Sequence, residues 1–80
     1  MVEMRIEILG TGCAKCKRQA RNVERAIEEL GIEAEVVKIE DISEIMDRNV
    51  MMTPALAIDG ELRASGRIVD VRELKEMLGG

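Results

Sequence analysis

Apolar and charged residues alternate at the start of the chain. Residues 4–9, MRIEIL, follow a period of two, which predicts a strand that Gly10-Thr11-Gly12 ends. Beyond it, apolar positions 16, 20, 23, 27 and 30 fall at intervals of four and three residues, which is typical of one face of an amphipathic helix. We therefore expect a helix over residues 13–30, with Gly31 in its C-terminal cap.

The remaining chain repeats both periods, with caps and turns between the segments. The predicted elements are a strand over 32–39, a short helix after the cap Asp41, strands over 55–58 and 61–64 joined by Asp59-Gly60, and a last helix after the cap Asp70.

The predicted order is strand, helix, strand, helix, strand, strand, helix. The first three elements form a βαβ unit, which makes their two strands parallel. The Asp-Gly turn makes the last two strands antiparallel. An α/β fold, β-α-β-α-β-β-α, with a mixed four-stranded sheet and helices on both faces accommodates all of these elements. At this length we expect a single domain over residues 1–80.

Composition narrows the functions that this fold can carry. The 80 residues include no aromatic side chain, and the formal net charge is −4. We therefore expect no nucleic-acid partner, because stacking platforms and a phosphate-neutralising surface are both missing. No stretch approaches the ~20 apolar residues of a membrane span, and residues 1–10 do not match a secretory signal. These observations predict a cytoplasmic protein with no membrane partner.

The charge is unevenly distributed. Residues 11–25 contain five cations and one acid, a net +4, which leaves −8 for the rest of the chain. The cations are Lys15, Lys17, Arg18, Arg21 and Arg25. A solvated helix face accounts for such a run. A second interpretation, compatible with the first, is that the cations favour the thiolate of a neighbouring cysteine.

Cys13 and Cys16 are the only cysteines, and they lie where the first strand gives way to the first helix. Cys13 is expected near the helix cap, where unpaired N–H groups and the helix dipole lower a thiol pKa from its usual value of about 8.5. Cys16 lies one turn later, on the apolar stripe, and should be buried. Such an asymmetric pair suits disulfide exchange, with Cys13 as the attacking nucleophile and Cys16 as the resolving thiol.

Three motifs together resemble the thioredoxin/glutaredoxin superfamily, and more closely the small archaeal and bacterial thioredoxin-like redox-active disulfide proteins. They are a strand running into GTGCAKC, Met52-Thr53-Pro54 before a strand, and the hairpin IDGEL. The resemblance implies a thioredoxin-like fold in which Pro54 is cis, lies against the cysteine pair and shapes a substrate groove with Thr53.

The resemblance also implies an activity. The chain would be a protein disulfide reductase or electron carrier whose Cys13–Cys16 disulfide serves in place of a cofactor. Its partners would be protein disulfides and either a thioredoxin reductase-like flavoenzyme or a low-molecular-weight thiol, and it would act as a monomer. Ala14-Lys15 between the cysteines matches neither the Gly-Pro of thioredoxin nor the usual Pro-Tyr of glutaredoxins, so the electron donor stays open.

The residues around the motif have further expected roles. Lys15 should stabilise the Cys13 thiolate. The substrate surface cannot be aromatic and must use Ala14, Met51, Met52 and their neighbours, although a methionine pair is more often plain core.

The two cysteines could also have roles other than disulfide exchange. A Cu(I) or Zn(II) carrier is the main alternative, but the terminal helix departs from the βαββαβ order of such domains, and a four-ligand zinc site needs two more ligands. Two inert buried thiols are a further alternative. Gly79-Gly80 is compatible with a sulfur-carrier tail, which the βαβ start argues against.

Overall fold

The structure, a computed structural model, describes residues 4–12 and 14–79. Its elements are β1 (Arg5–Leu9), α1 (Ala14–Leu30), β2 (Glu35–Ile39), α2 (Ile42–Asp47), β3 (Ala55–Ile58), β4 (Glu61–Ser65) and α3 (Val71–Gly79). This order confirms the predicted one. None of the helices in these ranges combines the length and the apolar character that crossing a membrane requires.

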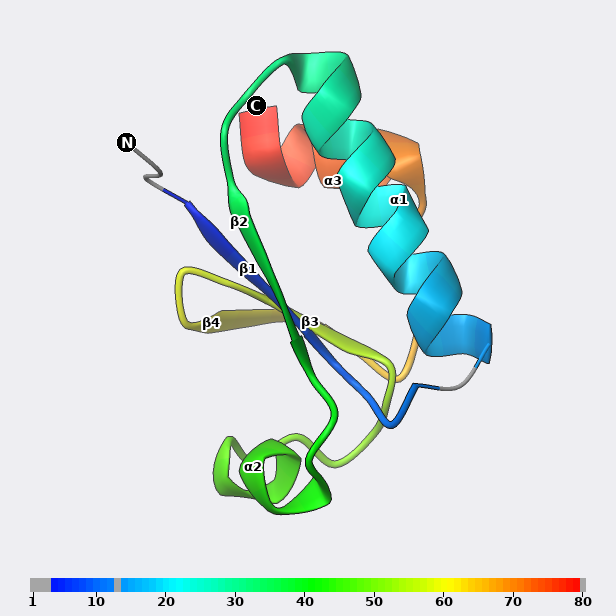
Figure 1. The fold of residues 1–80 in the computed structure, drawn as a ribbon, viewed down its shortest axis with the longest axis vertical. Helices are drawn as coiled ribbons and strands as arrows, with labels where there is room; N and C mark the ends of the chain where they lie inside the picture. The colour runs from blue at the N-terminus through cyan, green and yellow to red at the C-terminus, as the bar shows by residue number, and fades with distance from the viewer. Residues whose placement is uncertain (1–3, 13, 80) are drawn as a thin grey trace.

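One four-stranded sheet of order β2-β1-β3-β4 forms the centre of the fold (Figure 1). β1 pairs in parallel with β2, with Ile6 opposite Val36, and antiparallel with β3, with Ile6 opposite Ile58. β3 and β4 form the antiparallel hairpin, whose register shifts between Leu56 and Ala57. The mixed sheet predicted from the sequence is therefore confirmed, and β1 is an interior strand with partners on both sides.

The sheet buries both of its faces, and the apolar core divides accordingly. Figure 1 shows α1 and α3 packed together and α2 apart from them, at the other end of the view. The cluster beneath α1 and α3 contains Ile6, Ile8, Ala20, Val23, Ala26, Leu56, Ile58, Ala64, Val69, Leu74 and Leu78. The cluster beneath α2 contains Leu9, Ile39, Ile45, Val50, Ala55 and Ala57. Helices therefore cover both faces, as predicted.

The predicted start of the second strand is wrong, and the end of α1 explains why. Gly31 has φ +67°, its N–H bonds to the Glu28 carbonyl at 3.2 Å, and the Ile32 N–H bonds to the Ile27 carbonyl at 3.4 Å. This pair of bonds is a Schellman motif, which uses the first residues after the helix to close it. β2 consequently begins at Glu35 rather than at Ile32.

The predicted helix caps are present. Asp41 accepts a hydrogen bond from the Ser43 N–H at 2.8 Å at the start of α2. Asp70 accepts one from the Glu73 N–H at 2.8 Å at the start of α3. Arg67 donates two hydrogen bonds to Glu73, at 3.1 and 2.7 Å, and these bonds hold the pKa of the Glu73 carboxyl below its usual range. The loop entering α3 is thus tied to the first turn of that helix.

A buried glutamate on β1 departs from the simple alternating pattern. Glu7 lies on the α2 side of the sheet with only 3% of its side chain exposed. Arg48, at the C-cap of α2, contacts its carboxylate at 2.6 Å, and Arg5 lies 3.7 Å away. Because a buried charge is costly unless it is paired, this ion pair fixes the end of α2 against the central strand.

A second buried polar side chain connects α1 to the loop that precedes α3. Gln19 is fully buried; its Oε1 accepts the Val69 N–H at 2.7 Å, and its Nε2 donates to the Arg67 carbonyl at 3.3 Å. Asn22, one turn later, donates to the Val69 carbonyl at 3.0 Å. These bonds satisfy backbone groups that would otherwise be buried without partners.

We predict that Gln19→Leu lowers the free energy of unfolding by about 1–3 kcal/mol, because the buried Val69 N–H loses its acceptor while the volume changes little. Urea denaturation followed by circular dichroism measures this loss. Glu28→Leu, at an exposed position of the same helix, should change stability by no more than about 0.5 kcal/mol. Equal stability of the two variants would contradict the assigned role of Gln19.

Candidate active site

The site lies where β1 ends and α1 begins. The Gly10 N–H donates to the Ile39 carbonyl at 2.9 Å, so the pairing of β1 with β2 continues into the turn. Gly12 then adopts φ +84°, a left-handed conformation that suits glycine. Cys13, the predicted nucleophile, lies outside the described residues, and its assignment stays a prediction.

Cys16 is buried, as the apolar stripe predicted. It lies in the first turn of α1 with 6% of its surface exposed, on the side of the helix that also buries Ala20 and Val23. The neighbouring backbone is close to its sulfur. A Cβ added at Gly10 would overlap the Cys16 Sγ and would lie 3.3 Å from the Cys16 Cβ and 3.9 Å from the Pro54 Cα.

Gly10 therefore lies between Cys16 and Pro54, and only a residue without a side chain lets these two parts of the chain come together. In the sequence alone, Gly10 is only the residue that ends a strand. Its role depends on Pro54, which follows 44 positions later in the chain, so the local pattern alone could not reveal it. A glycine directly between a buried strand and a Cys-x-x-Cys motif was the only available signal.

Pro54 is fully buried at the start of β3, and the Thr53–Pro54 peptide bond is cis, as the resemblance implied. The segment before it is held against β4. The Gly66 N–H donates to the Pro54 carbonyl at 2.9 Å, and the Ser65 hydroxyl donates to the Met52 carbonyl at 3.3 Å. Thr53 is exposed beside it.

Two methionines give this end of the molecule an apolar surface. Met51 is 91% exposed and Met52 61% exposed, so the interpretation of the pair as plain core is wrong. The Met52 side chain lies over Gly66, where its Cε and Sδ would be 3.1 and 3.3 Å from an added Cβ. The polypeptide thus presents flexible thioethers next to Pro54, a kind of surface that adapts to varied partners.

A cavity of about 360 Å³ lies on the β2 side of Cys16. Its lining includes Cys16, the Gly10–Gly12 turn, and the side chains of Lys17, Lys38 and Glu40. Lys15, proposed from the sequence to act on Cys13, is exposed in the first turn of α1. The structure therefore brings Cys16, Gly10 and Pro54 together, whereas the action of Lys15 on Cys13 stays a prediction.

The alternative of a metal carrier gains no support here. Within residues 4–12 and 14–79, no group of three or more cysteine, aspartate, glutamate or histidine side chains is arranged to hold a metal ion. The sequence contains no histidine and only the two cysteines.

Known proteins resemble the chain in both sequence and structure. Residues 4–79 match the family described as "Thioredoxin domain". The thioredoxin of Methanothermobacter thermautotrophicus is 43% identical over 75 residues, 94% of this chain and 97% of that protein. The thioredoxin of Methanocaldococcus jannaschii is 48% identical over 73 residues, 91% of this chain and 84% of that protein.

Two solved structures share the fold at low sequence identity. Thioredoxin-2, a component of malaria parasite protein secretion machinery, superposes with a TM-score of 0.73 at 13% identity, covering 94% of this chain and 80% of that one. The oxidised thioredoxin of Plasmodium falciparum gives a TM-score of 0.64 at 18% identity, covering 99% and 84%. The thioredoxin-like arrangement expected from the sequence is therefore confirmed.

We predict that Gly10→Ala displaces the Cys16 sulfur, because the added methyl group overlaps it. Overpacking of this kind costs about 1–3 kcal/mol, and misplacing a reacting group slows its reaction by roughly tenfold to a hundredfold. Urea denaturation and the rate at which the reduced protein cleaves a small disulfide measure the two effects.

Gly31→Ala is the control for this variant. Its added methyl group meets open space, but its φ of +67° strains any side chain, so the variant should lose stability without a slower reaction. An unchanged disulfide-cleavage rate in Gly10→Ala would contradict the positioning role of Gly10.

Proposed function

The chain belongs to the thioredoxin family, and from this membership we propose that Cys13 and Cys16 are the redox-active dithiol of its disulfide oxidoreductase activity. Family membership makes the chain a thioredoxin-type oxidoreductase, which acts on protein disulfides and receives electrons from a reductase. We further propose that residues 1–80 act as one monomeric domain, and a cytoplasmic location stays a prediction from the sequence.

The observation that carries the proposal is the packing of the Cys16 sulfur against Gly10 beside Pro54. It supports an arrangement in which the resolving thiol is held in a fixed place behind a groove. That groove would be bounded by Thr53 and Pro54, with the exposed Met51 and Met52 on its outer side. As the family resemblance implies, backbone groups next to Pro54 would pair with the substrate peptide.

The exchange reaction balances with two thiols and no cofactor. The Cys13 thiolate attacks one sulfur of the substrate disulfide, forms a mixed disulfide and releases the other substrate sulfur as a thiolate. Cys16, after losing its proton to solvent, attacks the Cys13 sulfur and releases the second substrate thiolate. The substrate gains two electrons and two protons, and Cys13–Cys16 becomes a disulfide.

The start of α1 favours the first of these steps. A thiol next to a helix N-terminus has its thiolate stabilised by the helix dipole and by neighbouring cations. Lys15 is the cation that we assign to this task, since it follows Cys13 by two residues and is exposed in the first turn. A thioredoxin reductase-like flavoenzyme or a low-molecular-weight thiol would then reduce the Cys13–Cys16 disulfide.

We predict that iodoacetamide at pH 7 modifies Cys13 of the reduced protein much faster than Cys16, because Cys16 is buried and alkylation requires an accessible thiolate. A protease that cuts after glutamate releases residues 8–24 with both cysteines, and tandem mass spectrometry of this peptide at successive times locates the label and measures both rates. Lys15→Gln should slow the alkylation of Cys13, and unfolding in urea should bring the two cysteines to similar rates. Equal rates in the folded protein would contradict the assignment of Cys13 as nucleophile.

We also predict that Cys16→Ser accumulates a mixed disulfide with an oxidised protein substrate, since no second thiol can resolve it. Non-reducing electrophoresis detects the adduct, and added dithiothreitol releases it. Cys13→Ser is the matched control and should form little adduct. If Cys13→Ser formed the more abundant adduct, the two roles would have to be exchanged.

A further inference from the structure

The N-terminal half of α1 carries four exposed cations, Lys15, Lys17, Arg18 and Arg21. Within the part of the chain that the structure describes, none of the four lies within ion-pair distance of a carboxylate. Arg25, further along the same helix, instead pairs with Glu29 at 2.9 Å. We call these four cations the basic face.

Helix stability does not explain the basic face. The first turn of α1 contains no acidic residue, although acids are the residues that a helix dipole favours there and cations are disfavoured. Lys15 and Lys17 therefore oppose the dipole rather than complement it. A feature that works against its own helix calls for an explanation outside the helix.

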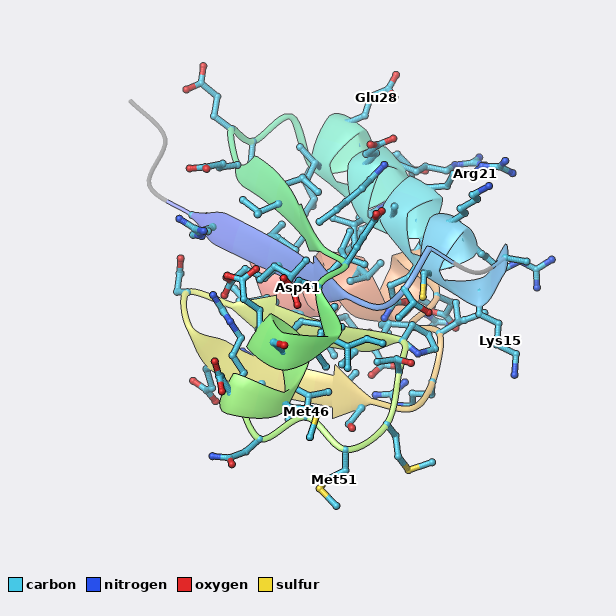
Figure 2. All side chains as sticks on the ribbon, turned by 60° about the horizontal axis from the view of Figure 1, so that its bottom comes forward. Lys15, Arg21, Glu28, Asp41, Met46 and Met51 are labelled. Atoms are coloured by element: carbon cyan, nitrogen blue, oxygen red, sulfur yellow. The ribbon has the colours of Figure 1, made fainter. Side chains whose placement is uncertain are left out.

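The basic face extends to the cavity beside Cys16. Lys15, Lys17, Arg18 and Arg21 line a hollow of about 390 Å³, together with Ala14 and Ile68. Lys17 also lines the cavity beside Cys16. Figure 2 shows Lys15 and Arg21 projecting from α1 on the same side of the molecule, away from Met46 and Met51. Through Lys17, a partner bound on this hollow would reach the cavity beside Cys16.

We propose that the basic face is the docking surface for acidic regions of protein disulfide substrates, an inference that rests on the proposed function. Residues 11–25 carry a net +4, and the rest of the chain carries −8. An acidic surface beside a substrate disulfide is attracted to the start of α1 and repelled by the remainder of the molecule. The encounter is therefore oriented, with the substrate disulfide turned towards the dithiol.

The composition favours an acidic protein over a nucleic acid as the negatively charged partner of the basic face. The chain is acidic overall and has no aromatic side chain on which a base could stack. Proteins with acidic patches need only a local positive surface, which acts within a Debye length of about 10 Å at 0.1 M salt.

Two synthetic peptides test the proposal. Each contains one intramolecular disulfide, and they differ only in carrying three aspartates or three lysines beside it. At about 20 mM salt, the reduced protein should cleave the acidic peptide roughly tenfold faster than the basic one, and salt of about 0.5 M should remove most of this preference. Cleavage rates follow from acid quenching and chromatography of the peptides.

Charge reversals locate the effect on the molecule. Arg18→Glu and Arg21→Glu should each slow cleavage of the acidic peptide roughly threefold at low salt, and the double variant should favour the basic peptide. Arg72→Glu changes the net charge equally. Arg72 is exposed on α3 and lines a separate hollow that contains none of the four cations of the basic face, so this control should keep the preference for the acidic peptide.

A neutral disulfide, bis(2-hydroxyethyl) disulfide, separates the docking surface from the chemistry. The rate for each peptide is divided by the rate at which the same variant cleaves this neutral disulfide, because a charge reversal at the start of α1 also acts on the Cys13 thiolate. The stated preferences in these divided rates support the proposal. If wild type cleaves the neutral disulfide but shows no preference between the two peptides, the docking surface is overturned and the proposed function is not. The same holds if Arg72→Glu loses the preference as fully as the Arg18 and Arg21 variants do. No cleavage of the neutral disulfide by wild type overturns the proposed function. Tighter binding of a fluorescent single-stranded oligonucleotide than of the acidic peptide would overturn the choice of a protein partner.

Discussion

β1 is buried on both of its faces and pairs with a strand on each side, and the neighbouring elements are held in place by their contacts with it. β1 pairs with β2 and β3, while α1 and α3 cover one of its faces and α2 covers the other. A strand in this position ends at a point that its neighbours fix, which gives the Gly10–Gly12 turn and the start of α1 a rigid base. The same burial forces the charge of Glu7 to find a partner, and the Arg48 guanidinium provides it.

Much of this arrangement follows from local sequence patterns. The two periods of apolar residues, the caps Asp41 and Asp70 and the Asp59-Gly60 turn suffice for the order of elements and the mixed sheet. The pattern fails where a residue's environment is set by a distant part of the chain. In the sequence, Gln19 and Glu7 resemble ordinary surface positions. Their partners, Val69 and Arg48, are distant in the chain and contact them only in the folded structure.

Some features of the candidate site could likewise be predicted from the local sequence, whereas others depend on the fold. The burial of Cys16 could be predicted from the amphipathic stripe of α1, and the cis bond before Pro54 could be predicted from the family resemblance alone. The contact of Gly10 with Cys16 and Pro54 required the fold. The exposure of Met51 and Met52 could not be predicted without the fold either. The hydrophobicity of an apolar residue does not tell whether the residue is buried in the core or exposed on the surface.

The topology also affects the order in which contacts around the candidate site form during folding. Both cysteines and the whole βαβ unit are contained in the first half of the chain, whereas Pro54 reaches Gly10 only when β3 pairs with β1 from the second half. Contacts so far apart in sequence form late, since closing a long loop costs more entropy than closing a short one. On the ribosome, where the N-terminal part emerges first, both cysteines of this chain leave the exit tunnel before the segment that places Pro54 beside Gly10.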